Sequence, residues 1–197
     1  MVFFLRDAVK AWEEKTGQKV GEAEQIMLYG WVPPIEKMDT TVAQMKNCKR
    51  LALSTNCIDR IGGLQGLVSL EILSLSRNQI KRLENLEAVA PTLEQLWLSY
   101  NNLTSLAGIE KLKKLKVLYC GNNKISSWSE VDRLKELPEL EDLLLQGNPL
   151  EKNSKDNGEN WRIEVLRRLP TLKKLDGRSF DLAEREQAEG ARKDMGE

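Results

Sequence analysis

The chain has 197 residues, 41% of them hydrophobic and 30% charged, and its 30 basic residues balance its 30 acidic ones. This length allows one core or a short repeat array, and the composition is that of a globular protein. The charge balance gives no electrostatic argument for nucleic-acid binding, and no stretch approaches the roughly 20 apolar residues of a membrane span. We therefore expect no nucleic-acid partner and no membrane partner.

The cysteines and the first residues indicate a compartment. Cys48, Cys57 and Cys120 are an odd number without metal-type spacing, which favours a reducing environment and no metal site. Charged residues from Arg6 onward interrupt the apolar start before a signal-peptide core could form. The cytoplasm is therefore the expected location.

Residues 1–24 are expected to form an N-terminal capping helix. Its apolar residues fall on one helical stripe, suited to cover the first repeat as a lid: Phe4, Leu5, Ala8, Val9 and Trp12. A degenerate repeat follows, in which Leu28, Ile35 and Met38 fit the register. Gly30 and Pro33 stand there in place of the expected Leu and Asn.

Residues 25–150 are expected to be leucine-rich repeats. The pattern L-x-x-L-x-L-x-x-N-x-L occurs in five copies, which begin at positions 48, 70, 93, 115 and 140. The x-L-x-L centre predicts a short strand with one face in the core, and stacked copies build a parallel sheet. The asparagines, spaced 22, 23, 22 and 25 residues apart, are expected to form a structural ladder that pairs backbone groups of neighbouring turns: Asn56, Asn78, Asn101, Asn123 and Asn148.

After each asparagine the apolar residues recur about every three positions, as in Ile58, Ile61, Leu64 and Leu67. This spacing predicts a helix or helical turn on the convex side. The expected architecture is an α/β leucine-rich-repeat solenoid of about six strand-helix repeats. It has a parallel sheet on one face, helices on the other and helical caps at both ends.

Two segments follow the repeats. Residues 151–178 are expected to be a polar loop, 151–160, and a C-terminal cap made of a helix and a last partial strand with Leu172 and Leu175. Residues 179–197 are expected to be a charged helical tail that is solvated and frays. It begins with a capping box of Asp181 and Glu184.

The chain lacks the groups of common catalytic sites. It contains no histidine, which excludes histidine-based triads and histidine-metal sites, and it has no glycine-rich phosphate loop. We expect neither enzymatic activity nor a cofactor. An enzyme would need a site built from Asp, Glu, Lys and Cys alone.

The outward face of the sheet offers a binding surface instead. The position between the two strand leucines reads Tyr29, Ala52, Ser74, Trp97, Tyr119 and Leu144 through the repeats. A contiguous row of aromatic and apolar side chains is more typical of an interaction site than of a solvated surface. The predicted protein-binding residues are Ile72, Trp97, Tyr100, Val117, Tyr119 and Leu144.

Several segments are more specific than the repeat pattern. AWEEKTGQ, LYGWVPPIEKMD, LEQLWLSYN, NNKISSWSEVDRL and RLPTLKKLDG closely resemble the leucine-rich-repeat light chains of axonemal outer-arm dynein, and the likeness covers nearly the whole chain. This resemblance implies a non-catalytic subunit, monomeric by itself, that docks on the motor region of a dynein heavy chain and regulates ciliary beating. It implies a place in the cytoskeleton of the cilium or flagellum.

The resemblance also assigns residues and a second partner. The predicted sheet-face residues would contact the heavy chain. The tail, with Arg185, Arg192 and Lys193, would reach toward the motor or the acidic surface of the microtubule, since some members associate with tubulin.

Two other functions use the same repeat. One is an adaptor that regulates a phosphatase, which should show many more repeats. The other is a spliceosomal repeat protein with the same type of C-terminal cap, which works beside an RNA-binding partner.

Overall fold

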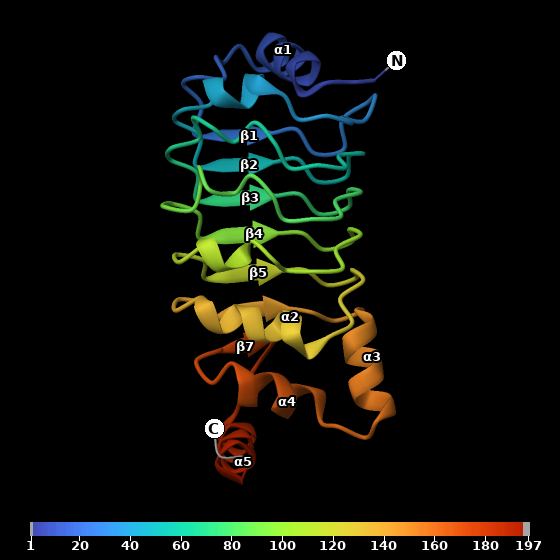
Figure 1. Ribbon diagram of the computed structural model, residues 1–197. Helices are drawn as coiled ribbons and strands as arrows, with labels where there is room; N and C mark the ends of the chain where they lie inside the picture. The colour runs from blue at the N-terminus through green and yellow to red at the C-terminus, as the bar shows by residue number, and fades with distance from the viewer. Residues whose placement is uncertain (1, 195–197) are drawn as a thin grey trace.

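The computed structural model describes residues 2–194 as a stack of coils, each of which adds one strand to a single sheet (Figure 1). The strands follow one another in chain order. The first seven are parallel, and the last pairs with the seventh in antiparallel orientation. They are β1 (Gln25–Met27), β2 (Arg50–Ala52), β3 (Ile72–Ser74), β4 (Gln95–Trp97), β5 (Val117–Tyr119), β6 (Asp142–Leu144), β7 (Lys174–Leu175) and β8 (Arg178–Ser179).

The repeat leucines form one continuous core behind the sheet. The central residue of each strand pairs in register with that of the next, so that Leu73, Leu96 and Leu118 are fully buried on neighbouring coils. Because side chains alternate along a strand, the residues on either side of these leucines point to the opposite, concave face. The predicted leucine-rich-repeat fold is therefore confirmed, and its concave sheet face is open.

The five asparagines form a ladder beside the ends of the strands. Asn101 accepts the Ile80 N–H at Oδ1 (2.9 Å), and its Nδ2 donates to the carbonyls of Leu75 and Leu98 (2.9 Å each). The same three kinds of bond recur at each rung, so a carbonyl such as that of Leu98 accepts from two consecutive asparagines. The ladder joins each coil to the next through side chains that are almost completely buried.

The convex side carries less helix than a strand-helix repeat predicts. Its short helices are η1 (Thr40–Gln44), η2 (Ile109–Lys111), α2 (Trp128–Asp132) and η3 (Arg133–Glu136). Residues 59–69 and 81–92 contain only turns. The apolar spacing of three explains this, since it suits 3-10 turns better than an α-helix of 3.6 residues per turn.

The N-terminal helix α1 (Leu5–Thr16) covers the first coil with four buried side chains, as the stripe predicts: Leu5, Ala8, Val9 and Trp12. The predicted register of the degenerate repeat is wrong by two residues. Ile26, not Leu28, pairs with Leu51, and Met27 instead of Tyr29 lies opposite Ala52. Two extra residues follow the strand, so that Ile35 again donates its N–H to the Asn56 side chain as its counterparts do.

The predicted polar loop is also wrong, because residues 149–156 form helix α3 (Pro149–Asp156). Pro149 occupies the first turn, where its missing N–H costs nothing. Glu151 accepts the Gly147 N–H (2.7 Å). Two ion pairs at i,i+4 spacing also support the helix, Glu151 with Lys155 and Lys152 with Asp156. Local charge pairing thus overrides a loop-like composition. In Figure 1, α3 lies beside the edge at which the strands end.

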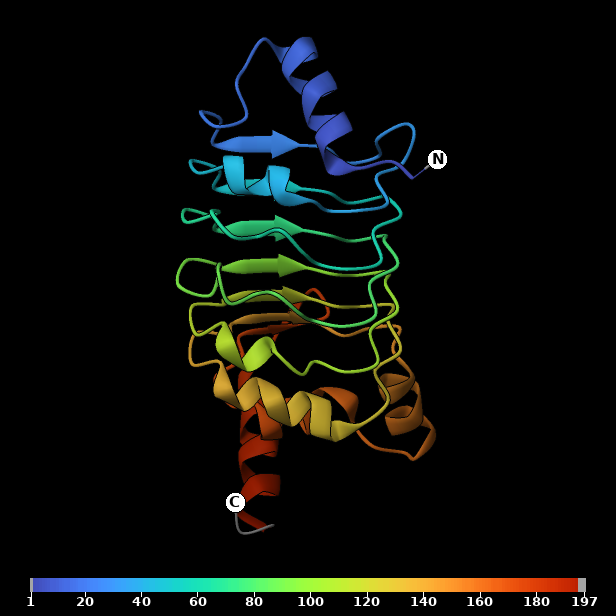
Figure 2. The ribbon, with the colours of Figure 1, turned by 45° about the horizontal axis from the view of Figure 1, so that its top comes forward.

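Helices α4 (Trp161–Arg168) and α5 (Leu182–Asp194) close the C-terminal end, and α5 projects from it (Figure 2). Leu172 and Leu175 are buried in the cap, and β7 contains Leu175. The start of α5 has the predicted capping box: Asp181 accepts the Glu184 N–H (2.8 Å), and Glu184 accepts the Asp181 N–H (3.1 Å). Its first turns are packed on the cap instead of solvated, since Ala188 is only 4% exposed. Residues 195–197 of the expected tail lie outside the described residues.

Candidate protein-binding surface

Two outward rows of the concave face carry all the predicted binding residues except Tyr100. The first row pairs Ala52, Ser74, Trp97, Tyr119 and Leu144 in register across β2 to β6. Its last three members are half-buried neighbours and form a continuous apolar strip. We call Trp97, Tyr119 and Leu144 the aromatic strip.

The second row interrupts the apolar surface. It pairs Ile72, Gln95, Val117 and Asp142 across β3 to β6, so the polar Gln95 separates Ile72 from Val117. Val117 extends the aromatic strip directly, whereas Ile72 lies one strand beyond it. The face therefore combines an apolar centre with polar side chains on both sides.

Trp97 is held by contacts on two sides. Its ring stacks on Tyr119 with centroids 6.0 Å apart and planes at 25°. The Arg50 guanidinium lies 5.5 Å from the centre of the indole, within cation-π range. These contacts explain why Trp97 is half-buried instead of fully solvated. They also hold the indole in one place before any partner arrives.

The opposite end of the strip is a small polar network. The Tyr119 hydroxyl donates to Asp142 (3.0 Å), and Lys174 Nζ from β7 donates to the same carboxylate oxygen (3.2 Å). Burial, together with the hydrogen bond to Asp142, raises the pKa of Tyr119. The phenol therefore stays neutral, with its ring fixed beside Trp97 and Leu144.

Some polar atoms of this face have no partner. Within residues 2–194, Trp97 Nε1, Arg50 Nε and Ser99 Oγ are buried side-chain atoms that form no hydrogen bond. Unpaired buried polar atoms are rare in native proteins, and each costs about 1–3 kcal/mol. Their presence on the concave face contrasts with the asparagine ladder, where the amide groups are paired.

Tyr100 lies at the edge of this face and not in either row. It follows the strand in a left-handed conformation (φ 59°), and it is 49% exposed. The Arg77 guanidinium stacks 4.3 Å from its ring centre. Tyr29, which the sequence placed in the first row, is exposed beyond the end of β1 instead.

The three predicted tail residues have different surroundings. Arg185 donates to the carbonyls of Pro170 (3.4 Å) and Leu172 (3.0 Å), so it holds α5 on the cap. Lys193 is exposed and forms an ion pair with Glu189 (2.7 Å). Arg192 points toward a groove in the cap. The structure therefore does not bring the three together as one site.

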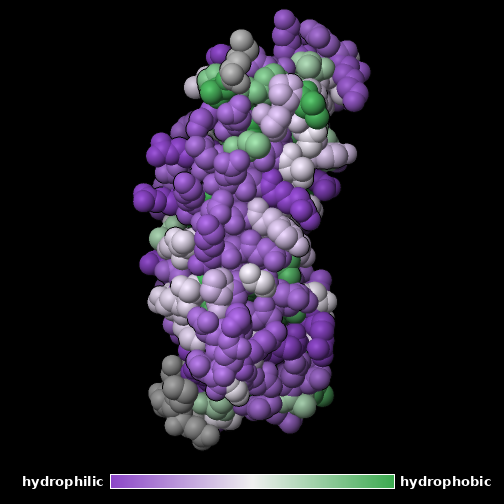
Figure 3. Space-filling model, turned by 90° about the vertical axis from the view of Figure 1, so that its right-hand side faces the viewer, coloured by the Kyte–Doolittle hydropathy of each residue, from purple (hydrophilic) through white to green (hydrophobic). Residues whose placement is uncertain are grey.

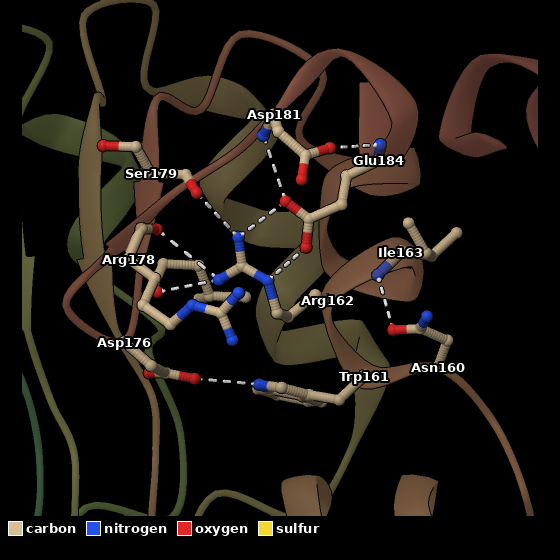
Figure 4. Close-up of polar contacts among 10 residues, drawn as sticks. Asn160, Trp161, Arg162, Ile163, Asp176, Arg178, Ser179, Asp181 and Glu184 are labelled. Carbon is tan, nitrogen blue, oxygen red and sulfur yellow. Dashed lines mark hydrogen bonds and ion pairs between the residues drawn. The ribbon is translucent and has the colours of Figure 1, made fainter. Parts of the chain in front are cut away.

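A second arginine anchors α5 (Figure 4). Arg162 on α4 donates to both carboxylate oxygens of Glu184 (2.5 and 3.0 Å) and to the carbonyls of Leu175 and Ser179 (3.1 Å each). The hydrogen bond from Arg162 holds the pKa of Glu184 well below its usual range, at about 2. This pair was not predicted from the sequence. The sequence feature that could have indicated it is an arginine in the cap helix followed by the acidic capping box of Asp181 and Glu184.

Asp176 is a second functional residue that was not predicted from the sequence. Its Oδ1 accepts the N–H groups of Leu145 (2.8 Å) and Gln146 (2.9 Å), and its Oδ2 accepts the Trp161 indole N–H (2.9 Å). Asp176 thus accepts hydrogen bonds from backbone donors of the last full coil, after the asparagine ladder has ended at Asn148. The L-D-G sequence of the cap was the available signal.

Other surfaces offer less for chemistry. Among the described residues no group of three or more His, Cys, Asp or Glu side chains could hold a metal ion. Burial raises the pKa of the Cys48 thiol to about 11 and raises that of Cys120 as well, so both stay protonated.

Across the described residues, no helix is both long and apolar enough to cross a membrane. The side of the stack seen in Figure 3 is mostly hydrophilic.

Comparisons with known proteins agree with this geometry. Residues 91–135 match the family described as Leucine Rich repeats (2 copies). The chain is 56% identical over 190 residues to Dynein axonemal light chain 1 of Chlamydomonas reinhardtii, covering 95% of this chain and 96% of that protein. It is 52% identical over 174 residues to Dynein axonemal light chain 1 of Homo sapiens, covering 88% and 90%.

Solved structures show the same architecture. A leucine-rich-repeat protein of Leptospira interrogans is 28% identical, with a TM-score of 0.64 over 78% of this chain and 37% of that one. A chain of the Drosophila melanogaster SNF/U2A' complex is 23% identical, with a TM-score of 0.57 over 99% of this chain and 98% of that one. At this identity the second likeness speaks for the fold alone.

Proposed function

The chain belongs to the axonemal dynein light chain 1 family, and from that premise we propose that it is a non-catalytic subunit that binds a dynein heavy chain through its concave sheet face. Through that contact it modulates ciliary or flagellar motility. The place of action is the axoneme, within the cytoskeleton. By itself the chain is monomeric.

The observation that carries this proposal is the aromatic strip. Interface hot spots are enriched in Trp and Tyr that are already ordered before binding, and the Trp97–Tyr119 stack fits that description. Such residues lose little conformational entropy when a partner covers them. A partner that covers Trp97, Tyr119 and Leu144 would remove half-buried apolar area from water.

The unpaired donors support the same face. The indole N–H of Trp97 and the Nε–H of Arg50 have no acceptor and are shielded from solvent, so a heavy-chain segment that shifts the neighbouring side chains can supply backbone carbonyls or carboxylates to them. Asp142 and Lys174 border the strip with one charge of each sign. Such a pattern selects partners by charge as well as by shape.

A contact with the microtubule is the weaker part of the proposal. Exposed Lys193 on α5 is the tail residue best placed to meet an acidic surface, while Arg185 is engaged with the cap. We assign to it a modulating role, because single exposed charges contribute little affinity.

Co-purification from detergent-extracted cilia tests the proposal. The parent should recover a dynein heavy chain, whereas the double variant Trp97→Ala, Tyr119→Ala should recover little. Val68→Ala is the matched control, since Val68 is 65% exposed but lies on the turn before β3 and outside the sheet face. Circular dichroism must show that all three proteins are folded.

Equal recovery by the double variant would reject the sheet face. Failure of the parent itself to recover a heavy chain would reject the partner.

A further inference from the structure

The turns before β6 and β7 share a sequence that the earlier coils lack, although the hydrogen bond that closes them also occurs before β3 and β5, from Leu70 to Leu67 and from Leu115 to Leu112. The sequence L-P-x-L occurs at Leu137–Leu140, before β6, and again at Leu169–Leu172, before β7. In both turns the N–H of the last leucine donates to the carbonyl of the first (3.3 and 3.1 Å). Because β6 and β7 pair in parallel register, the two turns lie next to each other.

A groove of about 640 Å³ opens between these turns. Its floor is apolar, formed by leucines of the two turns and by Leu134, and its walls include the exposed Pro138, Pro170 and Thr171. The volume lies in the range of sites that bind small molecules or short peptide segments. An apolar floor of this kind accepts the side chain of a leucine or similar residue.

The charge around the groove is one-sided. Four of its lining residues are basic, Lys135, Arg167, Arg168 and Arg192, and none of the lining residues that the structure describes is acidic. The whole chain has net charge zero, so this local excess is not a property of the composition. Three of the four already have a contact: Lys135 with Asp132 (2.9 Å), and both Arg167 and Arg168 with Glu164.

Arg192 differs from the other three. In the described part of the chain it forms no hydrogen bond or ion pair, although the adjacent Lys193 pairs with Glu189. It projects from α5 two turns after Arg185, whose bonds to Pro170 and Leu172 fix the helix against one of the two turns. The Arg192 guanidinium thus lies at the end of an apolar groove, one helical turn after Glu189, with which it interacts electrostatically, and its N–H groups can donate two parallel hydrogen bonds to a carboxylate.

We propose that this groove is a second docking site, which binds an acidic peptide segment of a partner protein. A leucine-type side chain of the segment enters between the two L-P-x-L turns, and flanking carboxylates meet Arg192 and Lys135. Charge complementarity selects an acidic peptide over a basic one. The proposal does not depend on heavy-chain binding by the sheet face, because the groove and the aromatic strip involve different residues.

A labelled synthetic peptide provides the probe. It consists of glutamates with two central leucines and carries fluorescein for anisotropy titration with the full chain. Arg192→Glu on α5 and Lys135→Glu on η3 should each weaken binding about tenfold, since each replaces an attraction by a repulsion. Lys124→Glu is the matched control, with the same charge change on an exposed residue outside the groove lining, and it should change the Kd less than about twofold.

Two further measurements locate and define the binding. Amide NMR shifts should change at residues 137–140 and 169–172. A peptide with glycines in place of the leucines should bind about tenfold more weakly.

Equal effects of Arg192→Glu and Lys124→Glu would overturn the proposal, as would shifts confined to the sheet face. So would equal binding of the glycine peptide, or no binding of the leucine peptide. Co-purification of a heavy chain with Arg192→Glu is measured separately from peptide binding. A negative result in the peptide titration therefore does not contradict the proposal that the sheet face binds the heavy chain.

Discussion

The asparagine ladder and the concave sheet face are built from the same repeats but differ in whether their buried polar atoms form hydrogen bonds. Along the ladder each amide has three backbone partners, and the side chains are almost fully buried. On the sheet face, Trp97 and Arg50 keep unpaired donors beside half-buried aromatic rings. A region whose polar groups are all paired is suited to hold the fold together. A region with ordered, half-buried aromatic rings is suited to meet a partner.

This contrast predicts that ladder substitutions damage stability and that sheet-face substitutions damage binding. The largest effect is expected for Asn101→Ala. It leaves the buried Ile80 N–H without an acceptor and removes one of two asparagine donors from the carbonyls of Leu75 and Leu98. Urea denaturation should show the free energy of unfolding reduced by about 3 kcal/mol.

Asn102→Ala is the control for the ladder, because within residues 2–194 the side chain of Asn102 forms no hydrogen bond, while its backbone N–H donates to the Ile80 carbonyl. Its free energy of unfolding should stay within about 0.5 kcal/mol of the parent. Equal free energies of unfolding for Asn101→Ala and Asn102→Ala would contradict the conclusion that the asparagine ladder stabilises the fold.

The next largest effect is expected for Leu144→Glu, on binding. The substitution places a charge in the aromatic strip near Asp142, and a partner would have to bury it unpaired. Affinity for the heavy chain, measured by titration calorimetry, should fall by about 2 kcal/mol or more, with little change in unfolding. Gln146→Glu, two residues further on and exposed, carries the same new charge outside the strip and should bind like the parent.

A pH prediction concerns the docking of α5. The folded-state pKa of Glu184 is about 2, below its ordinary value of 4.5, because Arg162 bonds the carboxylate. A depressed pKa means that this stability is present above about pH 4.5 and is lost as the pH falls toward 2. With 19% of the Glu184 side chain exposed, its contribution should be about 2 kcal/mol at neutral pH.

Glu184→Gln should therefore lower stability at pH 6 and approach the parent near pH 2, in denaturation followed at several pH values. Glu186→Gln, on the same helix but exposed, should not alter the pH profile. A constant difference between Glu184→Gln and the parent at all pH values would contradict the role of the ion pair.

The smallest effect is expected for Tyr119→Phe. It keeps the stack on Trp97 and removes only the bond to Asp142. Stability should fall by about 1 kcal/mol, and heavy-chain binding should change less than about threefold. A loss of binding as large as that of Leu144→Glu would show that the hydroxyl, and not the ring, makes the contact.

The sequence predicts those parts of the molecule that repeat. Five copies of one pattern specify the strands, the buried leucines and the spacing of the asparagines, because each copy supports the same assignment. The non-repeating parts depend on contacts between distant residues. The register at Ile26 depends on pairing with β2, the packing of α5 depends on Arg162 and Arg185, and the cap groove depends on two turns brought together by β6 and β7.

The sequence predicts the binding surface in part. Alternation along the strands is enough to place Trp97, Tyr119 and Leu144 on one face. It does not reveal that Gln95 separates Ile72 from Val117, or that the left-handed turn moves Tyr100 to the edge. Register between neighbouring strands and the conformation of the turns decide these details.

The most direct test is calorimetric titration of a purified dynein heavy-chain motor domain with three folded proteins: the parent, Trp97→Ala and Gln95→Ala. Trp97 and Gln95 are on the same strand and face, but only Trp97 belongs to the aromatic strip. The account predicts that Trp97→Ala weakens binding by about 2 kcal/mol or more, roughly thirtyfold, while Gln95→Ala binds nearly as the parent does. Equal affinity of Trp97→Ala and the parent would contradict it.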